Sequence, residues 1–324
     1  MINIYIFITN TYINKKITNN ILMLIQLVPE KFQPNYVSTY PCYSSGKNME
    51  EIMFEMLKEK QTQNEIETEY IYLPIFWTSY YVTHNYGKNI DDLYEFLKTL
   101  DKSKKYFTVV QAAFGIFVKN YNLNITVFTA GGGGLNIYNS ETMHEIEYYD
   151  MRRMIFYGNK GTYDIPLICL PQFPEISISK DIFCSFMGRF DTHKCRMDMK
   201  QIISNNEKYK LFESDNYDIY KNIINRSIFT LAPRGFGYTS FRIIEAILGN
   251  SIPIYIWDDK ITLPFSDELD WSKFCVIIQA SELHNLDNIL TNINIHEMQN
   301  NLLQVKELFT FENTIKYIIR KLIY

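Results

Sequence analysis

Residues 227–265 decide the fold, and they read SIFTLAPRGFGYTSFRIIEAILGNSIPIYIWDDKITLPF. An apolar strand is predicted over residues 228–231 and is followed by a glycine-containing loop. A helix is expected over residues 240–248 with Gly249 as its C-cap, and a continuously apolar strand over residues 252–257 comes next. A buried strand, a loop, a helix and another buried strand form the repeating unit of a parallel sheet with helices on both faces.

The same alternation of strands and helices continues upstream of this stretch. In the second half, a strand over residues 181–186 leads to Gly188, and a helix follows over residues 198–203. The first half is expected to contain helices over residues 49–60 and 90–100, strands over 69–76, 106–111 and 125–129, and a tight loop over 131–134. Two such series predict an α/β protein with two Rossmann-like halves that face each other. Ligands are then expected beyond the carboxyl ends of the strands.

Two apolar segments near the ends of the sequence allow alternatives. Residues 21–28 fit either a strand or a helix. Residues 314–324, TIKYIIRKLIY, predict a terminal helix that packs on its own protein, and the alternative is a basic amphipathic membrane helix. The first twenty residues have neither a signal-peptide pattern nor a membrane span, so we expect a cytoplasmic protein without an anchor.

The composition limits the class of protein. The chain has 324 residues, of which 47% are hydrophobic and 21% are charged, so we expect two compact domains and exclude a disordered or fibrous chain. A net charge of −4 argues against broad electrostatic binding of nucleic acid. The five cysteines lack C-x-x-C spacing, which argues against a disulfide framework or a zinc site and favours reduced thiols. Aromatic residues make up 15% and fit either core packing or the stacking of sugars or bases.

The loop and helix of residues 233–248 have the chemistry of an anion site. Unpaired N–H groups and the helix dipole favour an anion at the helix start, and Arg234 adds a guanidinium suited to phosphate. Arg242 and Glu245 lie three residues apart and share one edge of the helix. Glu245 is placed to bind two ribose hydroxyls, as acidic residues do in dinucleotide folds. The alternative is a solvated Arg242–Glu245 pair beside glycines that serve only the turn.

An ordered set of residues in this stretch extends the pattern beyond a single loop. Its members are Ser227, Phe229, Leu231, Pro233, Arg234, Gly235, Ser240, Phe241, Arg242, Glu245, Ala246, Ile252, Pro253, Leu263, Pro264, Phe265, Asp270 and Trp271. This order resembles the signature of the exostosin family of glycosyltransferases, with Thr230 in place of a frequent cysteine and Ile254 in place of valine. Upstream, Phe186, Gly188, Arg189 and Arg196 are similar to a strand and loop of that family, and the resemblance extends over residues 40–295.

The resemblance implies a GT-B fold, in which two Rossmann-like domains face each other across a cleft. The implied parts are an acceptor-side domain over residues 1–155, a nucleotide-sugar-binding domain over 156–296 and a helix over 297–324 that returns to the first domain. The implied activity is that of an inverting hexosyl- or pentosyltransferase in glycan biosynthesis, with a UDP-sugar as donor and a glycan or other hydroxyl as acceptor. The nucleotide-sugar is then a co-substrate, and neither a metal nor another cofactor is expected.

Inverting transfer requires that the charge on the leaving diphosphate be stabilised. The resemblance implies that basic side chains and helix N–H groups do this, and the catalytic cations expected here are Arg189, Arg196 and Arg234. The residues expected to bind the donor are Gly188, His193, Gly235, Tyr238, Thr239, Ser240, Arg242, Glu245 and Asp258. His193 also fits an incidental loop residue, and Asp258 an exposed turn acid. Asp258 and Asp259 lack the intervening residue of a metal-binding D-x-D motif.

The base for the acceptor hydroxyl is expected from the first domain. We name His84, because imidazole titrates near neutral pH and this residue follows a predicted strand end. Asp91, Asp92 or a carboxylate elsewhere are alternatives, and His84 also fits a plain surface loop. Residues 109–115 contain no carboxylate at the strand end, where a cleft acid is expected. A non-catalytic subunit of a glycosyltransferase complex is therefore the alternative function.

The remaining acceptor-side residues are assigned from aromatic and glycine patterns. Trp77 and Tyr80 are expected either to stack on acceptor sugars or to pack in the core, and Gly132 and Gly133 to lie at the acceptor side. A GT-B epimerase or hydrolase that uses the same cleft without an acceptor is a further alternative. A Rossmann oxidoreductase is disfavoured because no G-x-G-x-x-G follows a first strand.

Overall fold

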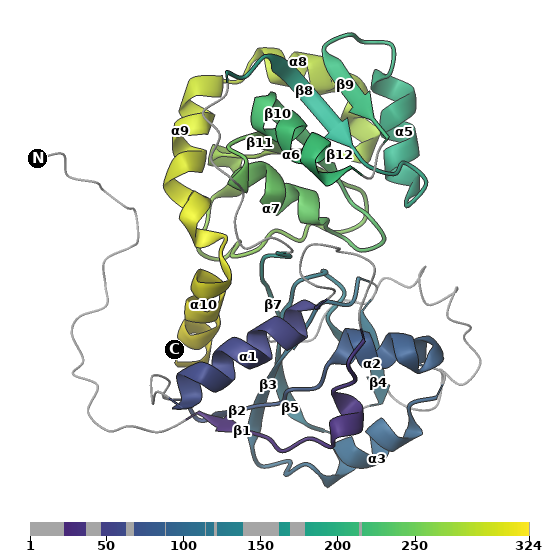
Figure 1. Ribbon diagram of the computed structural model, residues 1–324, viewed down its shortest axis with the longest axis vertical. Coiled ribbons are helices and arrows are strands. Elements are labelled where there is room, and N and C mark those ends of the chain that lie inside the picture. The colour runs from purple at the N-terminus through teal and green to yellow at the C-terminus, as the bar shows by residue number, and fades with distance from the viewer. Residues whose placement is uncertain are drawn as a thin grey trace, which may run out of the picture.

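The computed structural model describes residues 23–36, 47–62, 68–87, 89–113, 115–119, 122–138, 162–168, 179–213 and 216–323. The first 22 residues, Cys42, Cys169 and the domain boundary expected between residues 155 and 156 lie outside these ranges. Cys184, Cys195 and Cys275 are free and buried. Figure 1 shows two α/β halves, with the C-terminal helices running along one side of both.

The first half is built on a parallel sheet with the strand order β1-β2-β3-β5-β7. Its strands are β1 Leu24–Ile25, β2 Tyr70–Tyr72, β3 Lys105–Val110, β5 Asn124–Thr129 and β7 Thr162–Asp164. Its helices are α1 Met49–Thr62, α2 Trp77–Thr83 and α3 Asp91–Thr99, with 3₁₀ turns at Glu30–Phe32 and Asn85–Gly87. A small parallel pair is formed by β4 Ile116–Lys119 and β6 Leu135–Tyr138.

Helices cover both faces of this sheet, because successive residues of a strand point to opposite sides. Phe107 and Val109 of β3 pack in one core cluster with Met53 of α1. Tyr106 and Val110 of the same strand pack in another cluster with Leu93 of α3. The cluster on the α1 side continues into the second half of the chain, so the two halves share part of their core.

The second half repeats this plan with a parallel sheet in the order β12-β11-β10-β8-β9. Its strands are β8 Ile182–Met187, β9 Tyr209–Phe212, β10 Ser227–Pro233, β11 Ile252–Trp257 and β12 Val276–Gln279. Its helices are α5 Lys194–Ile203, α6 Tyr217–Arg226, α7 Phe241–Leu248, α8 Leu286–Thr291, α9 Ile295–Val305 and α10 Phe311–Ile323. Its 3₁₀ turns are Trp271–Lys273, Ala280–Asn285 and Lys306–Leu308. The two parallel sheets confirm the predicted fold class, two Rossmann-like domains of the GT-B kind.

Three boundaries differ from those predicted. The strand expected over residues 69–76 is shorter, and Trp77–Thr83 forms a helix whose buried face carries the aromatic residues. Helix α5 begins at Lys194, ahead of the predicted residue 198, because the preceding residue caps it. Strand β7 pairs with β5, so the first sheet extends beyond residue 155, where the sequence places the end of the first domain.

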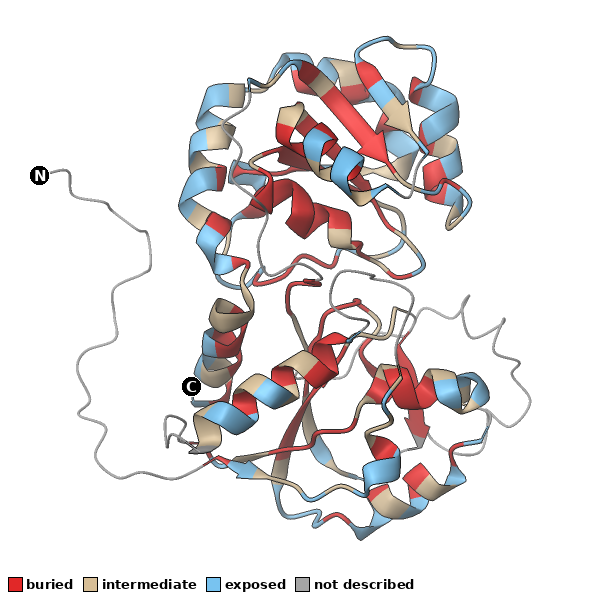
Figure 2. Cartoon of the chain, in the orientation of Figure 1, coloured by how far each residue is buried: buried red, intermediate tan, exposed pale blue. Residues whose placement is uncertain are grey.

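The two apolar segments near the ends also take defined places. Strand β1 lies within residues 21–28, which excludes the helical alternative there. Ile315, Ile318 and Leu322 of α10 are buried, so this helix packs on its own protein, and Figure 2 shows the buried side facing inward. Helix α10 also contacts α1. In the part of the chain that the structure describes, no helix is long and apolar enough to cross a membrane.

Loops at the carboxyl ends of the two sheets meet each other. Gly237 follows β10, and a Cβ atom placed on it would lie 2.7 Å from Gly131 O and 2.8 Å from Ala113 O. Gly131 and Ala113 follow β5 and β3, the central strands of the first sheet. The edges at which α/β sheets bind ligands therefore lie against each other, and the candidate site lies around this contact.

Candidate active site

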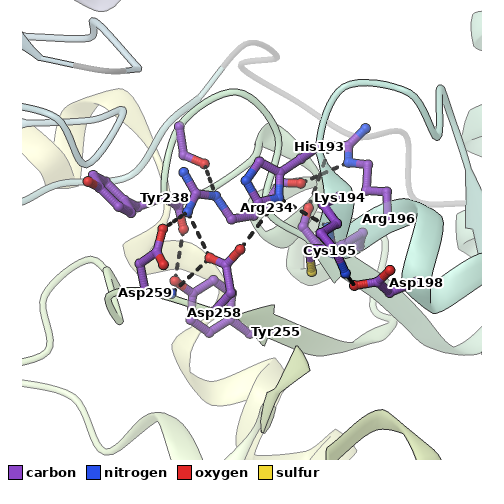
Figure 3. Close-up of polar contacts among 12 residues, drawn as sticks. His193, Lys194, Cys195, Arg196, Asp198, Arg234, Tyr238, Tyr255, Asp258 and Asp259 are labelled. Atoms are coloured by element: carbon purple, nitrogen blue, oxygen red, sulfur yellow. Dashed lines mark hydrogen bonds and ion pairs between the residues drawn. The ribbon is translucent and has the colours of Figure 1, made fainter. Parts of the chain in front are cut away.

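Arg234 is at the centre of the polar cluster shown in Figure 3, and its side chain is 6% exposed. Nη1 donates hydrogen bonds to Asp258 Oδ1 (2.7 Å) and Asp259 Oδ2 (2.8 Å). Nε donates to Gly237 O (3.0 Å), and the guanidinium lies 4.6 Å from the centre of the Tyr238 ring. Because Arg234 follows β10 and the two aspartates follow β11, adjacent parallel strands bring a buried cation and two carboxylates together.

Arg196 and Arg189 have different roles from Arg234. Arg196 is buried on α5, and its Nε donates to Arg234 O (2.8 Å) while Nη1 donates to Arg189 O (2.9 Å). These contacts hold the loop that carries Arg234, and stabilisation of the diphosphate charge by Arg196 stays a prediction. The Arg189 side chain is 65% exposed and pairs with Asp191, with Nη2 2.6 Å from Oδ2.

His193 is the N-cap of α5 and lies beside the Arg234 cluster. Its Nδ1 accepts a hydrogen bond from Cys195 N (3.2 Å) and lies 3.5 Å from Asp258 Oδ2. Burial lowers the pKa of His193, and the positive charge of Arg234 lowers it further, against the effect of the two aspartates. We therefore expect a neutral imidazole at neutral pH, with its proton on Nε2. The capping contact excludes an incidental loop residue, and donor binding by His193 stays a prediction.

Arg242 and Glu245 are both buried, which excludes the solvated ion pair that the sequence left open. The Arg242 guanidinium lies 4.6 Å from the centre of the Phe186 ring, and its Nη2 donates a hydrogen bond to Met187 O. Glu245 Oε2 accepts a hydrogen bond from Tyr220 OH on α6. Sequence patterns missed Tyr220 because nothing around it differs from an ordinary core tyrosine. The ribose contact of Glu245 stays a prediction.

Two of the predicted glycines are required by close packing within the second domain. Gly188 has φ +143°, and a Cβ atom there would lie 2.5 Å from Arg242 Nη2. A Cβ atom on Gly235 would lie 3.2 Å from Arg196 Nη2. Both glycines thus make room for buried arginines, and any contact with a donor comes in addition to this.

A pocket lies between the two domains next to the start of α7. Its lining includes Thr129, Gly132 and Asp164 from the first domain, and Thr239 and Thr262 from the second. Gly132 has φ +83°, and a Cβ atom there would lie 3.2 Å from the Thr262 side chain. The predicted acceptor-side Gly132 and donor-side Thr239 are therefore brought together.

The neighbours of this pocket divide between the two domains. A Cβ atom on Gly132 would also lie 3.1 Å from Tyr238 Cβ, so this glycine faces the second domain. Gly133 faces its own domain, since a Cβ atom there would lie 2.0 Å from Gly115 N.

Ser240 occupies the N-cap position of α7, and its buried Oγ has no hydrogen-bond partner among the described residues.

Trp77 and Tyr80 are core residues, and the expectation that they stack on acceptor sugars is wrong. Each is 1% exposed. Trp77 Nε1 donates to Thr108 Oγ1 (2.7 Å), and Tyr80 OH donates to Asp92. Neither ring has a free face on which a sugar can stack, so the core alternative holds for both.

His84 lies at the C-terminal end of α2. Its Nδ1 is 2.8 Å from Tyr80 O, and the two rings stack with centroids 3.9 Å apart. Among the described residues, the contacts of His84 go to α2 and do not reach the second domain. Asp92 is held by Tyr80 and by Lys31 Nζ (2.8 Å), and Asp91 lies in the first turn of α3.

A buried carboxyl group that the sequence patterns missed lies at the end of β3. Glu50, in the first turn of α1, is 1% exposed. Its Oε1 accepts hydrogen bonds from Gln111 N (2.9 Å) and Thr78 Oγ1 (2.6 Å). Burial raises the pKa of Glu50 to about 7, against the effect of these hydrogen bonds. The carboxyl group next to the strand end at residues 109–115 therefore comes from helix α1.

Replacing Glu50 by glutamine is expected to reduce the loss of stability as the pH rises. Folded Glu50, with its pKa raised to about 7, keeps its proton up to about that pH, whereas the pKa of a free glutamate is 4.5. The folded state therefore binds more protons in this range, and its free energy of unfolding falls as the pH rises. Between pH 5 and 8, we expect the wild type to lose about 2 to 3 kcal/mol of unfolding free energy that Glu50→Gln keeps. The measurement is chemical denaturation at each pH. Glu55→Gln, an exposed position of the same helix, is the control and should follow the wild type.

A comparison with protein families finds a match for the second half of the chain. The family model described as Exostosin GT47 domain matches residues 168–293. Residues 168–293 are therefore similar to an exostosin GT47 domain. This GT47 domain contains every predicted donor-side residue from Gly188 to Asp258, and the first-domain residues of the candidate site lie outside it.

Curated relatives match less than half of the chain. "Probable beta-1,4-xylosyltransferase IRX10" of Arabidopsis thaliana is 31% identical over 150 residues, which are 42% of this chain and 36% of that protein. "Probable glucuronosyltransferase GUT1" of Oryza sativa subsp. japonica is 32% identical over 106 residues, 33% of this chain and 25% of that protein. The matched region thus spans at most 36% of these relatives.

Solved structures resemble the chain only distantly. The GtfA/B complex gives a TM-score of 0.41 at 12% identity and covers 83% of this chain and 60% of that chain. The pneumococcal O-GlcNAc transferase GtfA in complex with UDP and GlcNAc gives a TM-score of 0.39 at 9% identity. The match covers 85% of this chain and 60% of that chain. Since both scores are low, the fold assignment rests on the two parallel sheets. Among the described residues, no group of three or more His, Cys, Asp and Glu is placed to hold a metal ion.

Proposed function

We propose that this protein is an inverting glycosyltransferase that moves a sugar from a UDP-sugar to a hydroxyl group of a glycan. The observation that carries the proposal is a buried arginine, Arg234, at a strand end of the GT47 domain that faces the first domain. The names of the curated relatives, a probable xylosyltransferase and a probable glucuronosyltransferase, support sugar transfer as the reaction class.

The donor half of the site suits a nucleoside diphosphate. In the proposed reaction, negative charge develops on the leaving diphosphate, and Arg234 with the positive end of the α7 dipole provides the complementary positive charge. Glu245 lies further along α7, where a carboxylate can accept hydrogen bonds from ribose hydroxyls. Tyr220 supports that assignment, because its hydroxyl holds one carboxylate oxygen in place.

We propose that the transfer proceeds without a metal ion and without a cofactor other than the nucleotide-sugar. The support is the position of Arg234 Nη1 between Asp258 and Asp259, at 2.7 and 2.8 Å. The guanidinium already binds both carboxylates that a divalent cation would need. Its positive charge then does what a metal does in sites of the D-x-D kind.

Binding of the donor is tested by thermal shift. We expect UDP, UDP-xylose and UDP-glucuronate to raise the melting temperature, and GDP and CMP to leave it unchanged. A ligand at one hundred times its Kd adds about 2.7 kcal/mol of stability. Glu245→Gln should lose most of the shift with UDP. Glu207→Gln, an exposed position of the same domain, should keep it.

Transfer is tested with xylo-oligosaccharides as acceptors, with and without EDTA. We expect a glycosylated product with an inverted anomeric centre, in an amount that EDTA does not change. Stabilisation by UDP without any product would favour the non-catalytic subunit, and a donor isomerised at constant mass would favour an epimerase. Absence of both stabilisation and product would overturn the proposal.

A further inference from the structure

Asp164 is a carboxylate between the two domains that no sequence pattern identified. It ends β7, the edge strand of the first sheet, where it is the register partner of Thr129 on β5. Its main-chain oxygen accepts a hydrogen bond from Phe265 N of the second domain (3.0 Å). This bond ties the strand end to the opposite domain and holds Asp164 in the lining of the interdomain pocket.

The opposite wall of this pocket belongs to the donor side. It includes Thr239, which directly precedes the N-cap of α7, and Thr262 of the loop after β11. The first-domain wall includes Gly132 on the acceptor side. Asp164 thus lies at a small pocket to which both domains contribute, and the base of a transfer between two bound sugars has to lie where the domains meet.

The Asp164 carboxylate is free to take a proton. Its side chain is partly exposed, and no hydrogen bond or ion pair to it occurs among the described residues. Burial raises the pKa of Asp164 to about 6, with Lys260 opposing and Asp267 adding to the rise. Tyr255 of β11 is the further titratable group that senses its charge. A carboxylate of this kind is ionised at neutral pH and is more basic than an ordinary aspartate.

The other candidate bases are engaged or enclosed. His84 is bonded and stacked to Tyr80 on α2. Glu50 is 1% exposed and its Oε1 is filled by hydrogen bonds. Asp258 and Asp259 are both bound by Arg234 Nη1.

We propose that Asp164 is the general base of the transfer, which extends the proposed function and rests on it. The Asp164 carboxylate takes the proton of the acceptor hydroxyl as that oxygen forms a bond to the anomeric carbon. The bond from that carbon to the diphosphate oxygen breaks, and its electron pair leaves with the nucleoside diphosphate. The anomeric configuration inverts, and the protonated Asp164 returns its proton to water.

The test compares Asp164→Asn with the wild type in transfer from UDP-xylose or UDP-glucuronate to xylo-oligosaccharides. We expect kcat to fall at least about 100-fold, because a general base contributes rate factors of this size. The thermal shift with UDP should persist, since asparagine keeps the shape of the side chain. The wild type should lose activity below about pH 6, and Asp164→Asn should lack this acidic limb. Asp101→Asn, a surface carboxylate of the first domain bonded to Ser103, is the control and should match the wild type.

Several outcomes overturn the inference, and they differ from those that overturn the proposed function. Transfer by Asp164→Asn at close to the wild-type rate overturns the inference alone, as does a loss of transfer in His84→Gln with retention in Asp164→Asn. A fall in kcat that comes with a lost UDP shift, or with an unchanged pH profile, assigns Asp164 a structural role instead. Absence of any transfer by the wild type overturns both proposals.

Discussion

Replacing Arg234 by methionine is expected to lower the transfer rate about 100- to 1,000-fold, the range found when one preorganised donor to a developing anion is removed. The guanidinium is the buried positive charge at the strand end where we propose that the diphosphate leaves. Methionine keeps much of the side-chain volume, so the loop is not emptied. The variant tests the charge, and the measurement is kcat with UDP-sugar donors.

The same substitution is also expected to destabilise the fold. It leaves Asp258 and Asp259 without their shared cation, and these side chains are 25% and 49% exposed. Because water still reaches both carboxylates, we expect a loss of about 1 to 3 kcal/mol, less than for a fully buried broken pair. Adding Asp258→Asn and Asp259→Asn should restore stability without restoring transfer.

A second arginine serves as a control, because it shows whether the loss of any arginine charge lowers transfer or only the loss of Arg234. Arg226 also binds a carboxylate through its Nε, 2.8 Å from Asp181 Oδ1, but its side chain is 38% exposed at the end of α6. Arg226→Met should leave transfer unchanged and alter stability by less than about 1 kcal/mol. Full transfer by Arg234→Met would contradict the proposed role of Arg234 at the leaving group.

The parts of the fold that depend on local sequence were predictable. Strand β11 covers residues 252–257 as expected, because an uninterrupted apolar run between polar turns leaves little choice. Helix α7 was recognisable from Ser240 before it and Gly249 after it. Arg234 was also recognisable, since an arginine in a glycine loop at a strand end has few purely structural uses.

The residues that sequence reasoning missed depend on contacts between distant segments. Glu50 binds the main chain 61 residues away at Gln111. Asp164 lines the interdomain pocket only because β7 joins the first sheet at its edge, which no periodicity in the sequence indicates. The strand expected over residues 69–76 is shorter and α2 follows it, because apolar residues around a short helix resemble a strand over so few residues.

Replacing Trp77 by alanine is expected to lower the free energy of unfolding by about 3 to 5 kcal/mol. The indole is 1% exposed, and its Nε1 donates to Thr108 Oγ1 at 2.7 Å. Truncation would leave a cavity between α2 and β3, and Thr108 Oγ1 would keep only the hydrogen bond that it donates to Leu73 O. The measurement is chemical denaturation of the variant and the wild type.

Trp77→Phe separates core packing from sugar stacking, the two roles that the sequence left open. Phenylalanine fills most of the space but donates no hydrogen bond, so we expect a loss of about 1 to 2 kcal/mol in stability. Its KM for the oligosaccharide acceptor should equal that of the wild type, because the buried ring has no face for a sugar. Tyr86→Ala, an aromatic position 44% exposed in the same domain, should change stability by less than about 0.5 kcal/mol. A raised acceptor KM for Trp77→Phe at unchanged stability would contradict the core role and indicate that the Trp77 ring contacts the acceptor.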